Sequence, residues 1–142
     1  MMISTRGRYA IRVMVDLAEH RNGKYIPMKD VAARQGISLK YLERILPVLT
    51  KAGMIEGVHG KGGGYKLTRE PDQYRIGDIL RLTEGELAPV ACLECDAEPC
   101  ARAADCRTLP LWIEFDKLIN DFFDSKTLQD LMQGDPADNY VI

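Results

Sequence analysis

Apolar residues recur every three or four positions along the first twenty residues, which is the period of an amphipathic helix. Ser4 and Thr5 are residue types that cap a helix start, and the pattern continues to about His20. The opposite side of this helix is basic. The apolar face comprises Tyr9, Val13, Met14 and Leu17.

Two shorter helices are predicted next, at about residues 28–35 and 39–52. Pro27 is suited to open the first and Gly36 to end it, while Ser38 is suited to cap the second. This order is typical of a helix-turn-helix, in which the second helix presents its N-terminal part outward. The alternative is an ordinary helical hairpin with a charged outer face. The buried stripe of the second helix is predicted to comprise Leu42, Ile45, Leu46 and Leu49.

The segments 54–58 and 65–68 read as two short strands around Gly60-Lys-Gly-Gly-Gly64. They predict a hairpin whose glycines let the tip lie close to another molecule. A nucleotide-binding loop is the alternative, but its motifs are absent and a strand follows where a helix is needed. The first part of the chain therefore predicts a winged helix-turn-helix.

The second half is again helical. A short helix is expected at about 76–83 and a longer one at about 109–123, whose apolar residues cover more than the ~100° stripe of a surface helix. So broad a face in so short a chain predicts a homodimer, with packing on its own domain as the alternative. Thr127 is suited to cap a last helix at 128–132. The broad apolar face of the longer helix comprises Leu111, Trp112, Ile113, Phe115, Leu118, Ile119, Phe122 and Phe123.

The expected fold is mainly α with a small β-hairpin wing, followed by a long C-terminal dimerisation helix. The expected division is a winged helix-turn-helix DNA-binding domain at 1–70, a linker with a short helix at 71–91, a cysteine-containing sensor loop at 92–108, a dimerisation helix with a short helix at 109–133, and a flexible tail at 134–142.

Charge separates the two halves of the chain. Residues 1–69 contain 13 Lys and Arg against 5 Asp and Glu, a net of +8, and residues 70–142 contain 6 against 16, a net of −10. A basic first half indicates nucleic acid binding, with a solvated charged surface as the alternative. The candidate DNA-contacting residues are Arg6 and Arg8 at the start, Ser38, Lys40, Tyr41, Glu43 and Arg44 on the recognition helix, and His59 and Lys61 on the wing. An ordinary structural role is the alternative for His59.

Hydrophobic residues make up 46% and charged residues 28%, which fits a soluble globular protein. Because the apolar runs fall short of the ~20 residues of a membrane span and no signal peptide pattern opens the chain, we expect a cytoplasmic protein without membrane contact. We expect no enzyme activity, since neither His20 nor His59 has a nucleophile at a recognisable spacing.

All four cysteines, Cys92, Cys95, Cys100 and Cys106, fall in one stretch with the spacing C-x2-C-x4-C-x5-C. In the reducing cytoplasm such a cluster indicates metal, iron–sulfur or redox chemistry more often than structural disulfides. Zinc usually shows two C-x2-C pairs, and here there is one. A reactive thiolate favours basic neighbours, whereas Glu94, Asp96, Glu98 and Asp105 are acidic. An iron–sulfur cluster, zinc, a thiol–disulfide switch and four ordinary thiols all stay open.

Several separate motifs resemble the IscR-like family of bacterial winged-helix regulators, over about residues 1–132. The resemblance implies a dimeric transcription factor. Some members hold an iron–sulfur cluster on three cysteines and a fourth ligand, whereas others have no cluster and answer to a protein partner. The motifs are Ser4-Thr-x-Gly7-Arg8-Tyr9-Ala10, Gln35-Gly-Ile-Ser-Leu39, Tyr41-Leu42-Glu43, Gly60-x-Gly62-Gly-Gly-Tyr65 and Cys106-x-x-x-x-Leu111-Trp112.

The resemblance places Cys92, Cys100 and Cys106 roughly where the cluster-binding members keep their three cysteines. Leu109 replaces the histidine of IscR, so Cys95 is the candidate fourth ligand, with a residue of the partner chain as the alternative. We expect a 2Fe–2S rather than a 4Fe–4S cluster, with zinc or no metal as alternatives. His59 stands where IscR has an arginine, so the operator sequence does not transfer.

The expected function is a dimeric transcriptional regulator whose binding to a palindromic double-stranded DNA operator changes with the cluster or thiol state of the four-cysteine loop. The alternatives are a winged-helix regulator with a thiol–disulfide or zinc site, and one controlled by a protein partner without a cluster.

Overall fold

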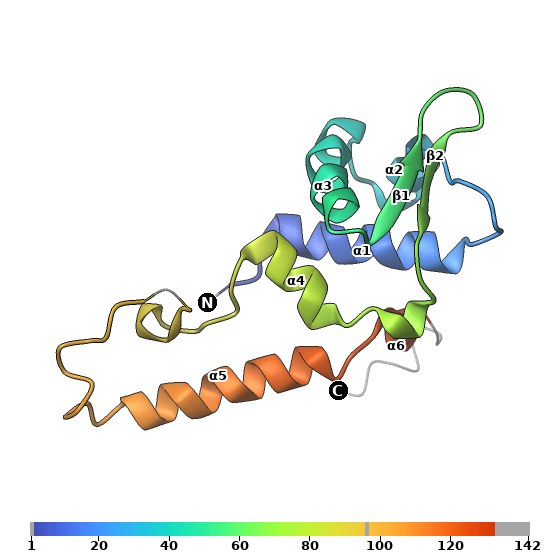
Figure 1. Ribbon diagram of the computed structural model, residues 1–142. Coiled ribbons are helices and arrows are strands. Elements are labelled where there is room, and N and C mark those ends of the chain that lie inside the picture. The colour runs from blue at the N-terminus through green and yellow to red at the C-terminus, as the bar shows by residue number, and fades with distance from the viewer. Residues whose placement is uncertain (1, 96, 133–142) are drawn as a thin grey trace.

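The computed structural model describes residues 2–95 and 97–132. It is mainly helical with one two-stranded antiparallel hairpin, which confirms the expected fold class (Figure 1). The expected flexible tail at 134–142 lies outside the described residues. The helices are α1 (Thr5–Glu19), α2 (Met28–Gln35), α3 (Leu39–Lys51), α4 (Ile76–Glu84), α5 (Leu109–Asp124) and α6 (Leu128–Met132), and the strands are β1 (Ile55–Val58) and β2 (Gly64–Leu67).

Helix α1 is the centre of the fold. Its apolar face is fully buried at Val13, Met14 and Leu17, because α2 and the hairpin pack on one side of it and α4 and α6 on the other (Figure 1). The Ser4 side chain accepts a hydrogen bond from the backbone N–H of Gly7 at 3.1 Å, which makes Ser4 the N-cap. The sequence-predicted start and apolar face of this helix are therefore confirmed.

The turn between α2 and α3 has the expected chemistry. Gly36 adopts a left-handed conformation with φ 64°, which glycine reaches without strain from a Cβ atom. Ser38 then caps α3 by accepting a hydrogen bond from the backbone N–H of Tyr41 at 3.1 Å. Pro27 stands one position earlier than expected: it is the extended residue before α2 and not its first helical residue.

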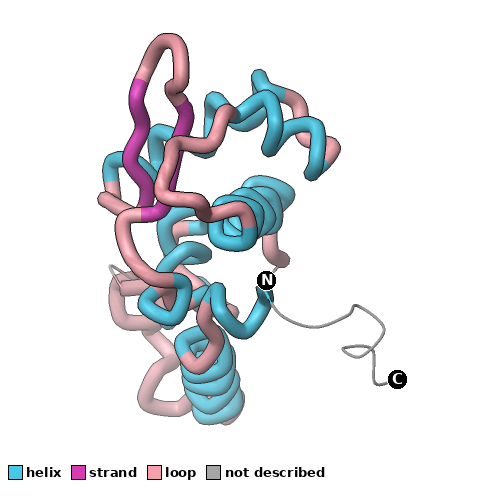
Figure 2. Tube along the Cα trace, turned by 90° about the vertical axis from the view of Figure 1, so that its right-hand side faces the viewer, coloured by secondary structure: helices cyan, strands magenta, loops and turns pink. Residues whose placement is uncertain are grey.

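The wing hairpin is tied to the helices at its base. Its register runs from the pair Ile55 and Leu67 to the pair Val58 and Gly64. Ile26 and Tyr65 exchange two backbone hydrogen bonds of 2.9 Å. The segment before α2 is thereby paired with β2 through a single antiparallel bridge. Figure 2 shows the hairpin projecting beyond the helices.

One continuous core extends from α1 to α6. It includes Ile76, Ile79 and Leu80 of α4, and Leu128 of α6, all of which are buried. Backbone hydrogen bonds from Ile76 to the carbonyl of Lys126 (2.9 Å) and from Leu128 to the carbonyl of Tyr74 (3.1 Å) join the start of α4 to the start of α6. The short helix expected near residue 76 is therefore present, and it packs on the winged-helix part.

Helix α5 lies apart from the winged-helix part and is held mainly through α4 (Figure 1). The Arg81 guanidinium donates to both carboxylate oxygens of Asp124, at 2.8 and 3.0 Å, and to the side-chain oxygen of Asn120 at 2.7 Å. These contacts fix the C-terminal half of α5. Among the described residues, the helices lack the length and apolar character needed to cross a membrane.

Candidate nucleic-acid interface and cysteine loop

The outward face of α3 carries four of the sequence-predicted DNA-contacting residues in exposed positions, because the opposite face is anchored in the core. Leu42, Ile45 and Leu49 are fully buried, which fixes how α3 is rotated about its axis. The exposed positions are Ser38, Lys40, Glu43 and Arg44. They lie in the first turns of a helix whose N-terminus is turned to solvent, as a recognition helix requires.

Tyr41 is half-buried and connects α3 to α1. Its ring packs edge-on against the ring of Tyr9, with 5.2 Å between the centroids and an interplanar angle of 71°. A small hollow beside it is lined by Arg6, Tyr41 and Arg44. The structure therefore brings Arg6 of α1 together with Arg44 of α3. Two guanidinium groups flanking one hollow suit a phosphate group.

Arg8 and Arg12 differ in how they are used. Arg8 is exposed and donates only a local hydrogen bond to the Thr5 hydroxyl at 3.0 Å. Arg12 donates to the side-chain oxygen of Gln35 at 3.2 Å and also to its backbone carbonyl, and its guanidinium lies 5.2 Å from the ring centroid of Tyr9. Arg12 thus supports the end of α2, whereas Arg8 stays available at the surface.

Asp16 is a structural residue that the sequence analysis missed. Although only 1% exposed, its carboxylate accepts hydrogen bonds from Arg34 at 3.0 and 2.7 Å and from the Gln35 amide at 2.9 Å. Burial on its own raises the pKa of Asp16, but the hydrogen bonds from Arg34 and Gln35, with the nearby positive charges, lower that pKa overall. The charge holds α2, and so the turn into α3, against α1.

The wing residues His59 and Lys61 are exposed at the tip of the hairpin. The tip and α3 lie on the same side of α1, away from α5 (Figures 1 and 2). The recognition helix and wing therefore present their candidate residues on one side of the protein. This is the arrangement that contact with a DNA duplex needs.

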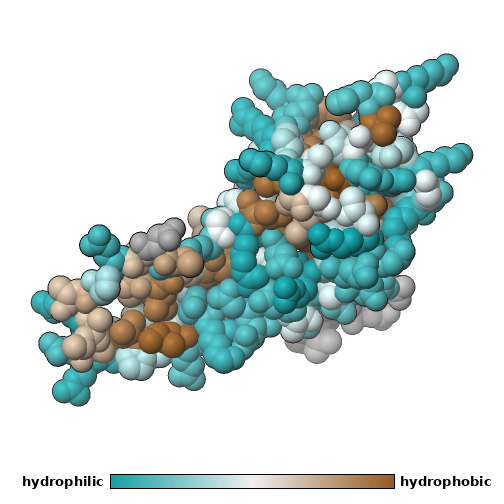
Figure 3. All heavy atoms as spheres, in the orientation of Figure 1, coloured by the Kyte–Doolittle hydropathy of each residue, from teal (hydrophilic) through white to brown (hydrophobic). Residues whose placement is uncertain are grey.

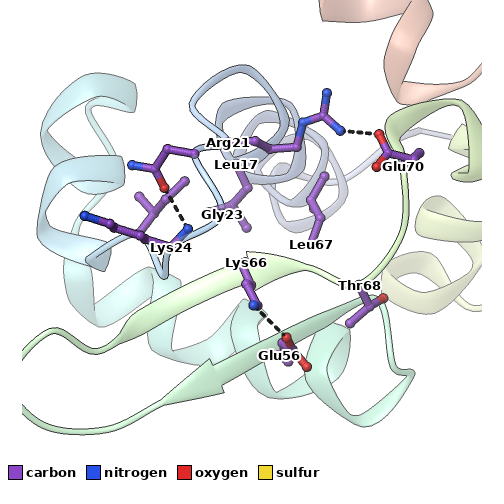
Figure 4. A pocket seen from close by; sticks show the side chains of 11 residues that line it. Leu17, Arg21, Gly23, Lys24, Glu56, Lys66, Leu67, Thr68 and Glu70 are labelled. Carbon is purple, nitrogen blue, oxygen red and sulfur yellow. Dashed lines mark hydrogen bonds and ion pairs between the residues drawn. The ribbon is translucent and has the colours of Figure 1, made fainter.

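A polar groove lies between the end of α1 and the base of the hairpin (Figure 4). Its charges pair with one another: Arg21 contacts Glu70 at 2.6 Å, and Lys66 contacts Glu56 at 3.4 Å. The Lys66 ammonium also lies 4.7 Å from the ring centroid of Tyr25. These pairs hold the hairpin base in place and carry no indication of a ligand.

The cysteine loop, residues 92–108, leaves its thiols near the surface. Cys92, Cys95 and Cys100 are exposed, Cys106 is half-buried, and all four are free thiols. The hydrogen bond between the Cys106 sulfur and the Thr108 hydroxyl, 3.5 Å long, is the main reason that the pKa of Cys106 is lowered. The backbone N–H of Cys95 donates to both carboxylate oxygens of Glu86, at 2.9 and 2.8 Å.

Thiolates are suitable ligands for an iron–sulfur cluster or for zinc, so the donor chemistry of this loop fits either group. Across residues 2–95 and 97–132, however, no three Cys, His, Asp or Glu side chains are close enough together to hold a metal ion. In the described conformation the thiols are therefore not arranged around a single metal ion such as zinc.

Helix α5 carries a second notable surface. Ile119 is buried, while five large apolar residues of this helix are between 42% and 66% exposed. Three of the five, Phe115, Leu118 and Phe122, line an apolar groove that Pro89 and Val90 also help to form. Figure 3 shows apolar residues gathered over the end of the molecule that α5 and the cysteine loop form. The exposed residues are Leu111, Ile113, Phe115, Leu118 and Phe122.

Comparison with known proteins gives one consistent result. Residues 3–134 match the family model named Rrf2, described as an iron-dependent transcriptional regulator. The chain is 41% identical over 135 residues to the protein rrf2 of Nitratidesulfovibrio vulgaris, covering 94% of this chain and 88% of that one. It is 36% identical over 132 residues to the HTH-type transcriptional regulator IscR of Aliivibrio salmonicida, covering 93% and 77%.

Among solved structures, the chain is similar to CymR, described as the global cysteine regulator of Bacillus subtilis. The TM-score is 0.76 at 37% sequence identity, and the match covers 93% of this chain and 96% of that chain.

Proposed function

The chain belongs to the Rrf2 family of transcriptional regulators, and on that premise we propose that it binds a palindromic double-stranded DNA operator as a homodimer. It is a transcriptional regulator and not an enzyme. The observation that carries the operator proposal is the meeting of Arg6, Tyr41 and Arg44 in one hollow beside the exposed start of α3. In this proposal α3 contacts the bases while Arg6 of α1 contacts a phosphate beside them.

Each candidate residue has a separate role in this proposal. Glu43 accepts a hydrogen bond from a cytosine amino group, while Arg44 and Lys40 reach base edges or phosphates from the same exposed face. Ser38 and Tyr41 position the first turn of α3 through the cap and the ring contact described above. Arg8, His59 and Lys61 contact the DNA backbone at the two ends of the interface.

The test of DNA binding is selection of bound duplexes from a random pool, followed by an electrophoretic mobility shift with the selected fragment at 50 to 200 mM salt. A sequence-specific regulator shifts that fragment at lower protein concentration than a scrambled one, and its affinity falls steeply with salt. Equal affinity for both fragments at every salt concentration contradicts the proposal.

The α5 face supports the homodimer. Leu111, Phe115, Leu118 and Phe122 recur at helical spacing, so these four exposed large apolar side chains share one face of α5 and form a larger apolar surface than scattered residues do. A second copy of the same helix covers this face in an isologous contact, which places two recognition helices on one palindrome. Sedimentation of the purified protein at micromolar concentration tests this, because a protein that remains monomeric contradicts it.

The cysteine loop is proposed to bind an iron–sulfur cluster through Cys92, Cys100 and Cys106, with Cys95 as the fourth ligand. The similarity to IscR and to a family described as iron-dependent supports this, as does the thiolate donor set. A bound cluster supplies a centre that oxidants, nitric oxide or iron shortage can alter. Anaerobic purification followed by absorption spectroscopy with iron and sulfide analysis is the test. A colourless protein that contains zinc, or no metal after reconstitution, rules the cluster out and leaves DNA binding intact.

A second candidate is regulation without a cluster. It is favoured by the similarity to CymR, described as a cysteine regulator, and by the surface position of the thiols. The signal is then a thiol–disulfide change or a protein partner. Thiol titration before and after mild oxidation, together with DNA affinity in both states, separates these cases. A disulfide that alters affinity identifies the thiol switch, whereas unchanged thiols and affinity favour the protein partner.

A further inference from the structure

The C-terminal end of α4 contacts the N-terminal end of α1 through one carboxylate. An oxygen of Glu84 accepts hydrogen bonds from the backbone N–H of Ser4 at 3.0 Å and from the Ser4 hydroxyl at 2.5 Å. The same Ser4 hydroxyl oxygen caps α1 by accepting from the N–H of Gly7. Residues 80 positions apart in sequence thus share one hydrogen-bonded cluster, and Glu84 holds the residue that starts α1.

Gly7 makes this contact possible. It is buried in the first turn of α1, and a Cβ atom at this position would lie 2.2 Å from the Glu84 carboxylate oxygen. Any larger residue therefore displaces the Glu84 carboxylate from its contact with Ser4.

The cluster sits directly beside candidate DNA contacts. Arg6 lies between Ser4 and Gly7 in the same turn, and it shares a hollow with Tyr41 and Arg44 of α3. The position of that turn relative to the recognition helix decides whether Arg6 and Arg44 face the same phosphate. Because Glu84 is fixed to α4, it sets that position from outside the helix-turn-helix.

The other side of the same short segment holds the cysteine loop. Glu86, two residues after Glu84, accepts the backbone N–H of Cys95 with both carboxylate oxygens at 2.9 and 2.8 Å. Gly85 separates the two, with φ 81°, which permits the chain to turn sharply out of α4. A displacement of the cysteine loop pulls on Glu86, and through Gly85 it reaches Glu84 within two residues.

We propose that Glu84 is a positioning residue for DNA binding, and that Glu84 and Glu86 together transmit changes in the cysteine loop to Arg6. The inference rests on the proposed function, since it takes Arg6 to be a phosphate contact. It differs from a purely structural role for Glu84 because it concerns a specific salt-dependent contact and not only the stability of the helix end.

The first experiment compares Glu84→Ala with Arg6→Ala and with the double variant, using mobility shifts over a range of salt. Loss of the anchor is expected to lower affinity about tenfold, and to reduce the slope of log affinity against log salt by about 2, because each of the two copies of the dimer loses one phosphate contact. Adding Arg6→Ala to Glu84→Ala is expected to cause little further loss, since both remove the same contact.

Two further variants keep this experiment decisive. Glu84→Gln retains an oxygen acceptor for Ser4, and its affinity is expected to fall between that of Glu84→Ala and that of the wild type. Glu70→Gln alters a carboxylate in a surface ion pair with Arg21, beyond the opposite end of α1, and is expected to leave the salt slope unchanged. If Glu84→Ala lowers the melting temperature but keeps the salt slope, and its effect adds fully to that of Arg6→Ala, the positioning role is wrong.

The second experiment addresses transmission from the loop. Glu86→Gln weakens the tie to Cys95, and hydrogen exchange is then measured by mass spectrometry on the protein as purified. Faster exchange of the Gly7 and Arg8 amides in this variant supports transmission, and unchanged exchange there overturns it.

Different results would overturn the proposed function and the positioning role of Glu84. If wild-type protein shows no salt-dependent DNA binding, the proposed function and the positioning role fall together. If the wild type binds but the slope of Glu84→Ala matches it, only the positioning role falls.

Discussion

Arg34 on α2 donates two hydrogen bonds, of 3.0 and 2.7 Å, to the buried carboxylate of Asp16 on α1. Arg34 comes two residues before Gly36, where the chain turns into α3. This ion pair therefore helps to fix the helix-turn-helix on the central helix, together with the contacts of Gln35. The pair is asymmetric, because the carboxylate is fully buried while a third of the arginine side chain is exposed.

Stability is predicted to depend on the ionisation of Asp16 at acid pH. Burial raises its pKa and the hydrogen bonds from Arg34 and Gln35 lower it, with a net shift downward. A carboxyl whose folded-state pKa is below its unfolded-state value of about 3.9 stabilises the fold above that pH, and the contribution is lost as pH falls through the lower folded-state value. Urea unfolding between pH 2.5 and 7 is the measurement. Asp16→Asn is expected to flatten the decline below about pH 4, and a curve parallel to that of the wild type contradicts this.

Removing the arginine is predicted to cost more than removing a surface partner. Arg34→Ala leaves the Asp16 carboxylate buried without its main donor, so we expect a loss of about 3 kcal/mol in the free energy of unfolding at pH 7. Arg21→Ala, the matched control, breaks an exposed pair with Glu70 and is expected to cost less than about 1 kcal/mol. Denaturant unfolding measures both. Equal losses show that the Arg34 pair has no special role.

The hydroxyl of Tyr74 is predicted to stabilise the base of the wing hairpin. It donates to the carbonyl of Met54 at 2.6 Å and accepts from the backbone N–H groups of Thr68 and Arg69 at 2.9 and 3.0 Å. Tyr74→Phe removes these partners, and we expect a loss of about 1–3 kcal/mol. In the control Tyr25→Phe, the ring keeps its contact with Lys66. If Tyr74→Phe leaves the melting temperature in thermal unfolding unchanged, the prediction is contradicted.

Substitutions in the DNA-contacting face are predicted to separate base reading from phosphate contact. Arg44→Ala is expected to relax the preference at one operator position by about 1–3 kcal/mol. Lys61→Ala is expected to weaken binding to all sequences alike and to reduce the salt slope by about 2, one phosphate contact being lost from each copy of the dimer. Competition binding with operator variants measures both effects. If neither substitution changes binding, the placement of α3 and the wing on DNA is incorrect.

One substitution on α5 is predicted to separate the dimer. Leu118 is 66% exposed in the single chain, so Leu118→Glu is expected to leave the fold intact and place a charge in the contact between copies. Sedimentation is expected to show a monomer, with circular dichroism unchanged and operator affinity strongly reduced. Lys117→Ala, one residue away, is the control and should remain dimeric. A dimeric Leu118→Glu variant moves the dimer contact elsewhere.

Local signals in the sequence predicted the elements well. The caps at Ser4 and Ser38 and the turn at Gly36 depend on residues within a few positions, so their chemistry is visible in the sequence. The buried stripe of α3 was also correct, because helical periodicity determines which residues share a face. Strand ends and the placement of Pro27 differed by one residue, since the exact ends depend on neighbouring contacts.

Contacts between distant segments were not predicted. Asp16 read as an ordinary polar residue, although its place between Val13 and Leu17 on the apolar side was a signal that it needs a partner. That partner, Arg34, is 18 residues away. The cysteines show the opposite case: their spacing suggested one site, yet among the described residues no three Cys, His, Asp or Glu side chains are arranged to hold a metal ion.

The sequence by itself determined the family's motifs, the helix and strand order, the basic charge of the first half and the apolar character of α5, because these follow from local propensity, periodicity and charge. Only the tertiary structure decided which carboxylate holds which helix: Arg34 to Asp16, Arg81 to Asp124 and Ser4 to Glu84. Such pairs are chosen by how the packed helices are oriented, and each charged residue has many possible partners until packing brings one within hydrogen-bond distance.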